Sequence, residues 1–153
     1  NSLLVTYEEI KNPKYKLLII GDGPEFNKLE KKFSSENIKF TSQLSNNETL
    51  DLIKKARCVV TATKLYEGQP TLLCEASLNH VPSIFPDTGG IKEFFPTDYK
   101  LTYEQFNYDE LKSIFNNINN EEIENIGLDV KNFYIENFSK DQYFETFESL
   151  ITT

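Results

Sequence analysis

Apolar positions along the chain follow two patterns that alternate. Short continuous apolar runs, each ending at a glycine or a polar residue, are typical of strands buried on both faces. We expect these strands at residues 15–20, 38–41, 57–62, 82–85 and 99–102. Elsewhere apolar residues recur three or four positions apart, as they do along one face of a helix. That spacing predicts helices at residues 2–11, 24–33, 46–56, 71–78, 89–95, 107–119, 121–136 and 139–151.

This alternation predicts the class of fold. Parallel strands need a crossover connection, and the expected helices would supply it. We therefore expect one α/β domain over residues 1–153, in which helices cover both faces of a parallel sheet and residues 103–153 form a helical tail. The polar residues expected to cap helix starts are Asn46 or Asn47, Thr71 and Ser139. A sheet of this kind binds its ligand at the carboxyl ends of the strands.

Composition and charge exclude several classes of function. The 153 residues are the length of one domain, and 16 basic against 24 acidic side chains give a net charge of -8. Such a surface repels nucleic acid and anionic lipid. Cys58 and Cys74 stand alone in apolar stretches, so we expect buried free thiols in a reducing compartment rather than a disulfide or a zinc site. No apolar run approaches the ~20 residues that cross a bilayer.

Glycines follow two of the expected strands. Gly21-Asp22-Gly23 follows the first strand, and Gly89-Gly90 follows the fourth. Glycine lets the backbone approach a ligand closely, and the N–H groups that begin the next helix attract anions. A tight strand-to-helix turn also needs glycine for steric reasons in many folds, so neither turn is decisive alone. Several such turns on one sheet edge favour an anionic ligand of nucleotide size.

Two glutamates flank the start of the helix that follows the third strand. Glu67 lies in the loop and Glu75 lies about 6 Å further along the axis, in the second turn of the helix. Such a pair can accept hydrogen bonds from two hydroxyls of one elongated ligand, with a phosphate held between them by the helix amides. It can also act as a general acid and base. Alternatively, Glu67 is a solvated loop residue and Glu75 interacts with the helix dipole. The spacing does not choose among these three.

The order of the motifs is more specific than any one of them. LLIIGDGPEFNKLE is followed by LIKKARCVVTATKLYEGQPTLLCEASLNHVPSIFPDTGGIKEFF, in which two glutamates eight apart precede a strand that starts with proline and a Gly-Gly turn. Over about residues 2–95, the chain resembles the carboxyl-terminal, donor-binding domain of GT-B glycosyltransferases of family 4, also called group 1. The resemblance implies a Rossmann-like domain, the second of two in a longer enzyme.

The resemblance implies a role for each residue that matches a family motif. Glu67 is the catalytic candidate and would hydrogen-bond hydroxyls of the donor sugar, while Glu75 would accept from the ribose hydroxyls. Backbone amides that would face the sugar and the diphosphate are those around Gly68, Gln69, Thr71 and Leu72. The other donor-binding candidates are Gly21, Asp22 and Gly23 on the diphosphate side, Ser42 and Gln43 near the base, and Thr63 beside the loop.

The resemblance also implies an activity and its partners. The enzyme would transfer a hexosyl group from a nucleoside diphosphate sugar with retention of configuration, without a metal or other cofactor. It would act in polysaccharide or glycoconjugate assembly in the bacterial cytoplasm. The acceptor would bind to a missing amino-terminal domain. Any membrane contact would also be made through that domain, so the whole enzyme would be membrane-peripheral at most.

The chain departs from the family pattern in three respects. The family carries an arginine and a lysine that clamp the diphosphate, on a turn that would lie upstream of Asn1. Arg57 stands where the family has an aspartate at the start of a strand, so it is no substitute, and we do not expect Lys64 to replace the pair. Asn79-His80 stands at a helix end where the family usually has a glycine, and we expect the histidine to be a helix-end residue rather than a catalyst. We therefore expect the isolated chain to bind donor weakly and to transfer no sugar.

Two other functions would use the same fold. One is a GT-B enzyme with different chemistry, such as a nucleotide-sugar epimerase or a phosphorylase, although the spacing of Glu67 and Glu75 argues against most of these. The other is a partner-binding subunit that kept the fold and lost catalysis, against which the presence of both glutamates weighs. Product analysis would identify the first, and calorimetry with nucleoside diphosphates would identify the second.

Overall fold

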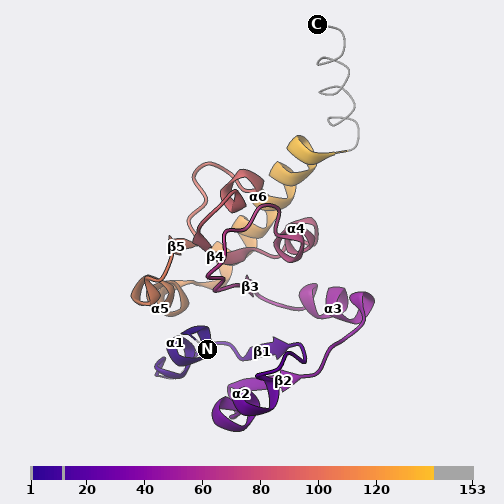
Figure 1. Ribbon diagram of the computed structural model, residues 1–153. Coiled ribbons are helices and arrows are strands. Elements are labelled where there is room, and N and C mark those ends of the chain that lie inside the picture. Colours follow the sequence, from indigo (N-terminus) through magenta and orange to yellow (C-terminus); the bar gives the residue numbers. More distant parts are fainter. Residues whose placement is uncertain (1, 12, 140–153) are drawn as a thin grey trace, which may run out of the picture.

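The computed structural model describes residues 2–11 and 13–139 (Figure 1). Expected strands and helices in these ranges all have counterparts, although several are shorter than the apolar runs that predicted them. The helix expected at residues 139–151 lies outside the described residues, apart from Ser139, which follows the last helix. The elements in order are α1 Ser2–Glu8, β1 Leu17–Ile20, α2 Phe26–Phe33, β2 Ile38–Thr41, α3 Asn46–Ile53, β3 Val59–Val60, α4 Thr71–Leu78, β4 Ser83–Asp87, the 3-10 helix η1 Ile91–Phe94, β5 Thr102–Glu104, α5 Tyr108–Asn117 and α6 Asn120–Phe138.

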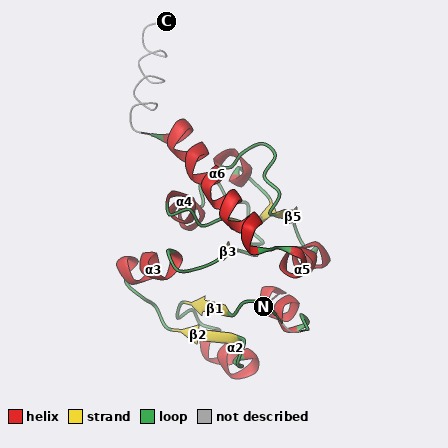
Figure 2. Ribbon diagram, turned by 180° about the vertical axis from the view of Figure 1, so that it is seen from behind, coloured by secondary structure: helices red, strands yellow, loops and turns green. Residues whose placement is uncertain are grey.

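The strands are parallel and fall into two hydrogen-bonded groups. β1 pairs with β2 over the register Leu17↔Ile38 to Ile20↔Thr41. β4 is the centre of the other group and pairs with β3 on one side and with β5 on the other. Figures 1 and 2 show the first group beside α1 and α2 and the second beside α4, α5 and α6. The predicted α/β architecture of parallel strands flanked by helices is confirmed.

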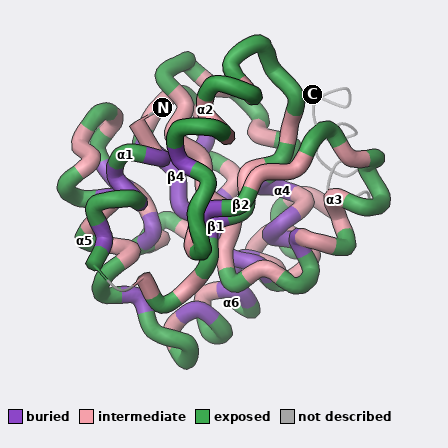
Figure 3. Tube along the Cα trace, turned by 90° about the horizontal axis from the view of Figure 1, so that it is seen from below, coloured by how far each residue is buried: buried purple, intermediate pink, exposed green. Residues whose placement is uncertain are grey.

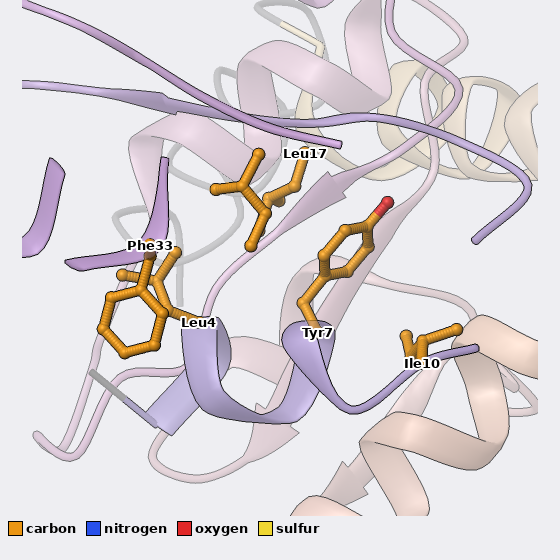
Figure 4. Packing of buried hydrophobic residues seen from close by; sticks show 6 residues of the cluster. Leu4, Tyr7, Ile10, Leu17 and Phe33 are labelled. Atoms are coloured by element: carbon orange, nitrogen blue, oxygen red, sulfur yellow. The ribbon is translucent and has the colours of Figure 1, made fainter. Parts of the chain in front are cut away.

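The β1–β2 group is built on a cluster of apolar side chains from α1, α2 and the two strands. Leu4, Tyr7 and Ile10 recur at helical spacing, and they belong to one buried cluster with Leu17 of β1 and Phe33 of α2 (Figure 4). The same face of α1 contacts α5, where the Phe115 ring meets the Tyr7 ring edge-on at 5.5 Å. Leu3, Val60 and Phe115 pack against both this cluster and the one under β5, so the two strand groups share one core.

The β3–β4–β5 group holds the most deeply buried residues. β4 is buried from Ser83 to Pro86, and Figure 3 shows this stretch as a continuous buried segment. Its residue Ile84 faces the cluster that contains Leu111 of α5, while Phe85 faces the cluster that contains Leu73 of α4. This strand therefore has helices on both faces, as its uninterrupted apolar sequence predicts.

The start of α3 differs from the expectation. Ser45, rather than Asn46 or Asn47, is the capping residue: its hydroxyl accepts a hydrogen bond from the Glu48 N–H at 3.3 Å. The Glu48 carboxylate accepts one in return from the Ser45 N–H at 2.9 Å. The expected caps are wrong because this reciprocal pair satisfies two amides at once, which requires serine and glutamate three residues apart.

The end of α4 confirms the structural role expected for His80. Its backbone is left-handed, with a φ of 61°. The His80 N–H donates to the Ser77 carbonyl at 3.1 Å, and the Val81 N–H donates to the Ala76 carbonyl at 2.9 Å. These two bonds form a Schellman motif, whose left-handed position is usually glycine. The imidazole lies on the surface, with Nε2 2.6 Å from Nζ of Lys131.

Replacing His80 with glycine is expected to raise the free energy of unfolding by about 0.5–1 kcal/mol, because the left-handed strain of a side chain at this position is relieved. Urea denaturation followed by circular dichroism measures the change. His80→Ala is the control, because alanine keeps the strain and loses only the surface contact with Lys131. Equal stabilities for the glycine and alanine variants would contradict the argument.

Candidate functional site

A pocket of about 300 Å³ opens at the carboxyl end of β3, between the loop that follows this strand and the start of α4. It brings together five residues expected to form a site. These are Thr63, Glu67, Gln69, Thr71 and Leu72. Its remaining lining residues are Thr61, Pro70, Leu73 and Ile91. The pocket therefore lies at the edge of the sheet at which the strand and helix order predicts a ligand.

Glu67 is the acidic residue in the wall of this pocket. Its carboxylate accepts a hydrogen bond from the Thr63 hydroxyl, with 3.1 Å between the two oxygens. The Thr63 oxygen itself accepts the Leu65 N–H at 3.1 Å, which fixes the threonine side chain. The Glu67 main chain is also held, because its carbonyl accepts the Gly90 N–H at 2.9 Å. The carboxylate is thus held in a defined position, and Glu67 is half-buried in a loop that is otherwise largely exposed.

The start of α4 forms the opposite wall. Pro70, and not Thr71, occupies the cap position, and it makes no side-chain cap bond. The expected cap is wrong because the proline ends the loop and Thr71 is already helical. The first amides with a carbonyl partner are those of Leu73 and Cys74, which donate to the Pro70 carbonyl at 2.9 and 3.1 Å. The amides of Thr71 and Leu72 belong to the first turn, which has no intrahelical acceptors, so they can bind an anion.

Gln69 is held by two residues behind the pocket. The Tyr134 hydroxyl on α6 and the Gln69 side chain both hydrogen-bond to the thiol of Cys74. Burial raises the pKa of the Cys74 thiol. Burial and the bond to this thiol raise the pKa of Tyr134 to about 12. Both groups are therefore neutral near pH 7, and they connect the pocket loop to α6 without adding charge.

Several expected site residues lie outside the pocket wall. Gly21, Asp22 and Gly23 form the turn after β1, in which Gly21 has a φ of 142° and the other two are exposed. Ser42 and Gln43 are exposed in the loop after β2, and Gly68 is exposed in the pocket loop itself. Glu75 is half-buried in the second turn of α4 and does not line the pocket. Their expected roles in donor binding remain predictions.

Four lining residues were not among the expected site residues. Thr61 lies near the end of the apolar run that predicted β3, and Ile91 directly follows the Gly-Gly turn. Pro70 and Leu73 flank the start of α4. Their positions at strand and helix ends could have identified them, but their apolar or small side chains carry no chemical signal. Ile91 and Leu73 are buried and supply the floor of the pocket.

The charges around this edge are mostly acidic or paired. Lys92 forms an ion pair with Asp87 at 2.5 Å, and Lys64 is exposed in the loop that contains Glu67.

Both cysteines are free, Cys74 buried and Cys58 half-buried, and burial raises the pKa of Cys58 to about 11. Within residues 2–11 and 13–139, no three side chains of the metal-ligating types gather at one point. Among the helices within residues 2–11 and 13–139, none is both long enough and apolar enough to span a membrane.

Comparisons with known proteins agree on one family and one fold. A family model described as "Glycosyl transferases group 1" matches residues 2–128. No curated protein sequence matches the chain. The solved structures that it resembles include "Crystal Structure of TarM", a protein that a second structure assigns to S. aureus, at 19% identity with a TM-score of 0.76 over 99% of this chain and 31% of that one.

Two further structures extend the comparison. Anabaena Alr3699/HepE in complex with UDP-glucose is 17% identical, with a TM-score of 0.78 over 97% of this chain and 44% of that one. AviGT4, a glycosyltransferase involved in avilamycin A biosynthesis, is 13% identical, with a TM-score of 0.63 over 99% of this chain and 47% of that one. At these identities the likeness establishes the fold. The chain spans less than half the length of each of the three proteins.

Proposed function

The chain belongs to the glycosyl transferases group 1 family, and we propose that it is the carboxyl-terminal, donor-binding domain of a retaining, metal-independent glycosyltransferase. The observation that carries this proposal is the pocket that Glu67 lines together with the first turn of α4, where the amides of Thr71 and Leu72 have no intrahelical acceptor. An anionic diphosphate fits the amides, and a polyhydroxylated sugar fits the carboxylate. The similar Anabaena protein, whose structures hold UDP-glucose and UDP, supports the same class of ligand.

In the proposed mechanism, backbone amides stabilise negative charge and Glu67 positions the donor sugar. The first-turn amides of Thr71 and Leu72 would stabilise the negative charge that develops on the departing nucleoside diphosphate. Glu67 would accept hydrogen bonds from sugar hydroxyls and hold the anomeric carbon toward the acceptor. Glu75 would accept from the ribose, and the turn at residues 21–23 would line the diphosphate side. A basic pair and an acceptor domain, both supplied by a longer chain, would complete the enzyme.

The proposal places this enzyme in the cytoplasm, in the assembly of a polysaccharide or another glycoconjugate. Because the proposed basic pair would hold the diphosphate and the proposed acceptor domain would bind the second substrate, the isolated chain is expected to bind donor weakly and to transfer no sugar. Transfer by this chain alone, at a rate comparable to that of a two-domain enzyme, would contradict the proposed division of labour. The anomeric configuration of the product, followed by NMR during turnover of the longer enzyme with and without EDTA, tests retention and independence from metal.

A thermal-shift screen against uridine, guanosine and adenosine diphosphates tests the binding class directly. A ligand present at ~100 times its dissociation constant should stabilise the fold by about 2.7 kcal/mol. If no nucleoside diphosphate shifts the melting temperature or releases heat in calorimetry, and Glu75→Ala changes nothing, the partner-binding subunit becomes the better interpretation. Isomerised or phosphorolysed sugar among the products of the longer protein would instead indicate an epimerase or a phosphorylase.

Replacing Glu67 with glutamine is expected to reduce UDP-glucose affinity by about tenfold or more while leaving UDP affinity within about twofold, because a charged hydrogen bond to the sugar is lost. Isothermal titration calorimetry with both ligands measures the two affinities. Glu36→Gln removes the same charge from an exposed loop before β2 and is the matched control. A parallel loss of UDP and UDP-glucose binding in Glu67→Gln would contradict a role at the sugar.

A further inference from the structure

The turn after β4 packs directly onto the main chain of Glu67. The Gly90 N–H donates to the Glu67 carbonyl at 2.9 Å. Gly89 has a φ of 61°, and a Cβ atom at this position would overlap the Glu67 carbonyl oxygen. The same atom would lie 2.9 Å from the Glu67 nitrogen and 3.0 Å from its carbonyl carbon. Both conformation and space therefore require glycine at position 89.

This requirement is specific to one glycine of the pair. Gly90 has a φ of −93°, which any residue adopts. The atoms nearest to a Cβ there are at the end of the exposed Glu93 side chain, with Oε1 at 3.3 Å. Gly68, the residue after Glu67, has open space on the side where a Cβ would lie. The close approach is thus a single contact, between Gly89 and the backbone of the residue that faces the pocket.

A second contact fixes the carboxylate itself. Thr63 has one hydroxyl proton, and it donates that proton to Oε1 of Glu67. Its oxygen accepts the Leu65 N–H, so both local bonds of the hydroxyl are used within the loop. The Thr63 hydroxyl therefore cannot donate to a ligand without releasing Glu67. This arrangement differs from the direct donor-binding role that the family resemblance implies for Thr63.

We propose that Gly89 and Thr63 are positioning residues for Glu67: Gly89 lets the turn after β4 hold the Glu67 main chain, and Thr63 aims the Glu67 carboxylate into the pocket. The inference rests on the proposed function, in which Glu67 binds the donor sugar. It ties the sugar end of the pocket to two separate strand ends, those of β3 and β4. The nucleotide end, at the first turn of α4, makes neither contact.

The first test compares Gly89→Ala with Gly90→Ala, the same substitution one residue along. Gly89→Ala is expected to lower UDP-glucose affinity by about tenfold or more, with UDP affinity within about twofold of the parent chain. Gly90→Ala keeps its N–H and is expected to bind both probes as the parent does. Calorimetry measures the affinities, and amide hydrogen exchange by NMR reports the bond to Glu67. The Gly90 amide should exchange faster in Gly89→Ala.

The second test separates space from backbone strain. Asparagine tolerates a left-handed backbone, but it carries a Cβ atom. Gly89→Asn should therefore behave like Gly89→Ala. An asparagine variant with parent UDP-glucose affinity and a protected Gly90 amide would overturn the assignment of Gly89, because the steric contact would then be unnecessary.

The third test addresses Thr63 and remains informative if a Gly89 variant fails to fold. Thr63→Val removes the hydroxyl and keeps the shape, so UDP-glucose affinity should fall while UDP affinity does not. Thr63→Ser keeps a hydroxyl at this position, so its UDP-glucose affinity should equal that of the parent chain. Without any ligand, the Leu65 amide should exchange faster in the valine variant and at the parent rate in the serine variant. If Thr63→Ser restores neither the UDP-glucose affinity nor the parent exchange rate of the Leu65 amide, the role of Thr63 is overturned.

The ligand-free readouts distinguish failure of this inference from failure of the proposed function. If the parent chain binds neither UDP nor UDP-glucose, the proposed function fails for these donors. The exchange rates of the Gly90 and Leu65 amides then still decide whether Gly89 and Thr63 hold Glu67. Unchanged exchange in Gly89→Ala and Thr63→Val, with binding intact, would overturn the positioning roles and leave the proposed function standing.

Discussion

Replacing Gly127 with alanine is expected to lower the free energy of unfolding by about 2 kcal/mol, the size of an overpacking effect in a closed core. At an exposed helical position the same change would stabilise by about 1 kcal/mol, because alanine is the better helix former. Gly127 lies buried in α6, where a Cβ atom would overlap the carbonyl oxygen of His80. It would also lie 3.1 Å from the His80 carbonyl carbon and 3.4 Å from Cδ of Pro82.

The sign of this effect depends on how closely α6 approaches the end of α4. Relief of the overlap requires α6 to move away from the turn at His80, and Val130, which is completely buried three residues further along α6, would lose contacts. Asn132→Ala is the control, since position 132 is exposed on the same helix and should be neutral or slightly stabilised. Urea denaturation gives both values. A more stable Gly127→Ala chain would show that the helices do not pack this tightly.

The apolar patterns predicted the order and type of the elements because each depends on local spacing. β2 occupies residues 38–41 and α4 occupies residues 71–78, as the spacing predicted. Strand lengths were less predictable. The run at residues 57–62 predicted a strand of six residues, but only Val59 and Val60 pair with β4, because pairing depends on a neighbour that the run itself does not specify. The division of the strands into two groups is likewise a property of tertiary contacts.

The candidate site was predictable where a residue type carries its own chemistry. Glu67 and the start of α4 could be recognised because a carboxylate and free helix amides bind polar ligands wherever they occur. The residues that hold Glu67 could not be assigned in the same way. Gly89 was visible as part of a turn, but its contact with Glu67 joins two loops that are 22 positions apart in the sequence. Such a contact becomes apparent only when both strand ends are placed.

Gly127 illustrates the same limit for stability. A glycine within a helical pattern normally indicates a weak point or a helix end. Its reason here is the carbonyl of His80, which projects from a Schellman motif 47 residues earlier in the chain. His80 itself was predictable as a helix-end residue, since histidine tolerates the left-handed conformation. The close packing of Gly127 against the His80 carbonyl was not predictable from the sequence.

Truncating Phe85 to alanine is expected to cost about 4 kcal/mol, the typical loss for a fully buried phenylalanine. Its ring is inaccessible to solvent and lies 4.5 Å from the Phe95 ring and 5.5 Å, nearly parallel, from the Tyr99 ring. The cavity would open beneath Leu73 and Ile91, which form the floor of the pocket, so ligand affinity should fall together with stability.

Phe106→Ala removes the same side chain from an exposed loop and should change stability by less than about 0.5 kcal/mol. If Phe85→Ala does not fold, Phe85→Leu should still lower the urea midpoint, and a midpoint equal to that of the parent chain would contradict a tightly packed core under the site.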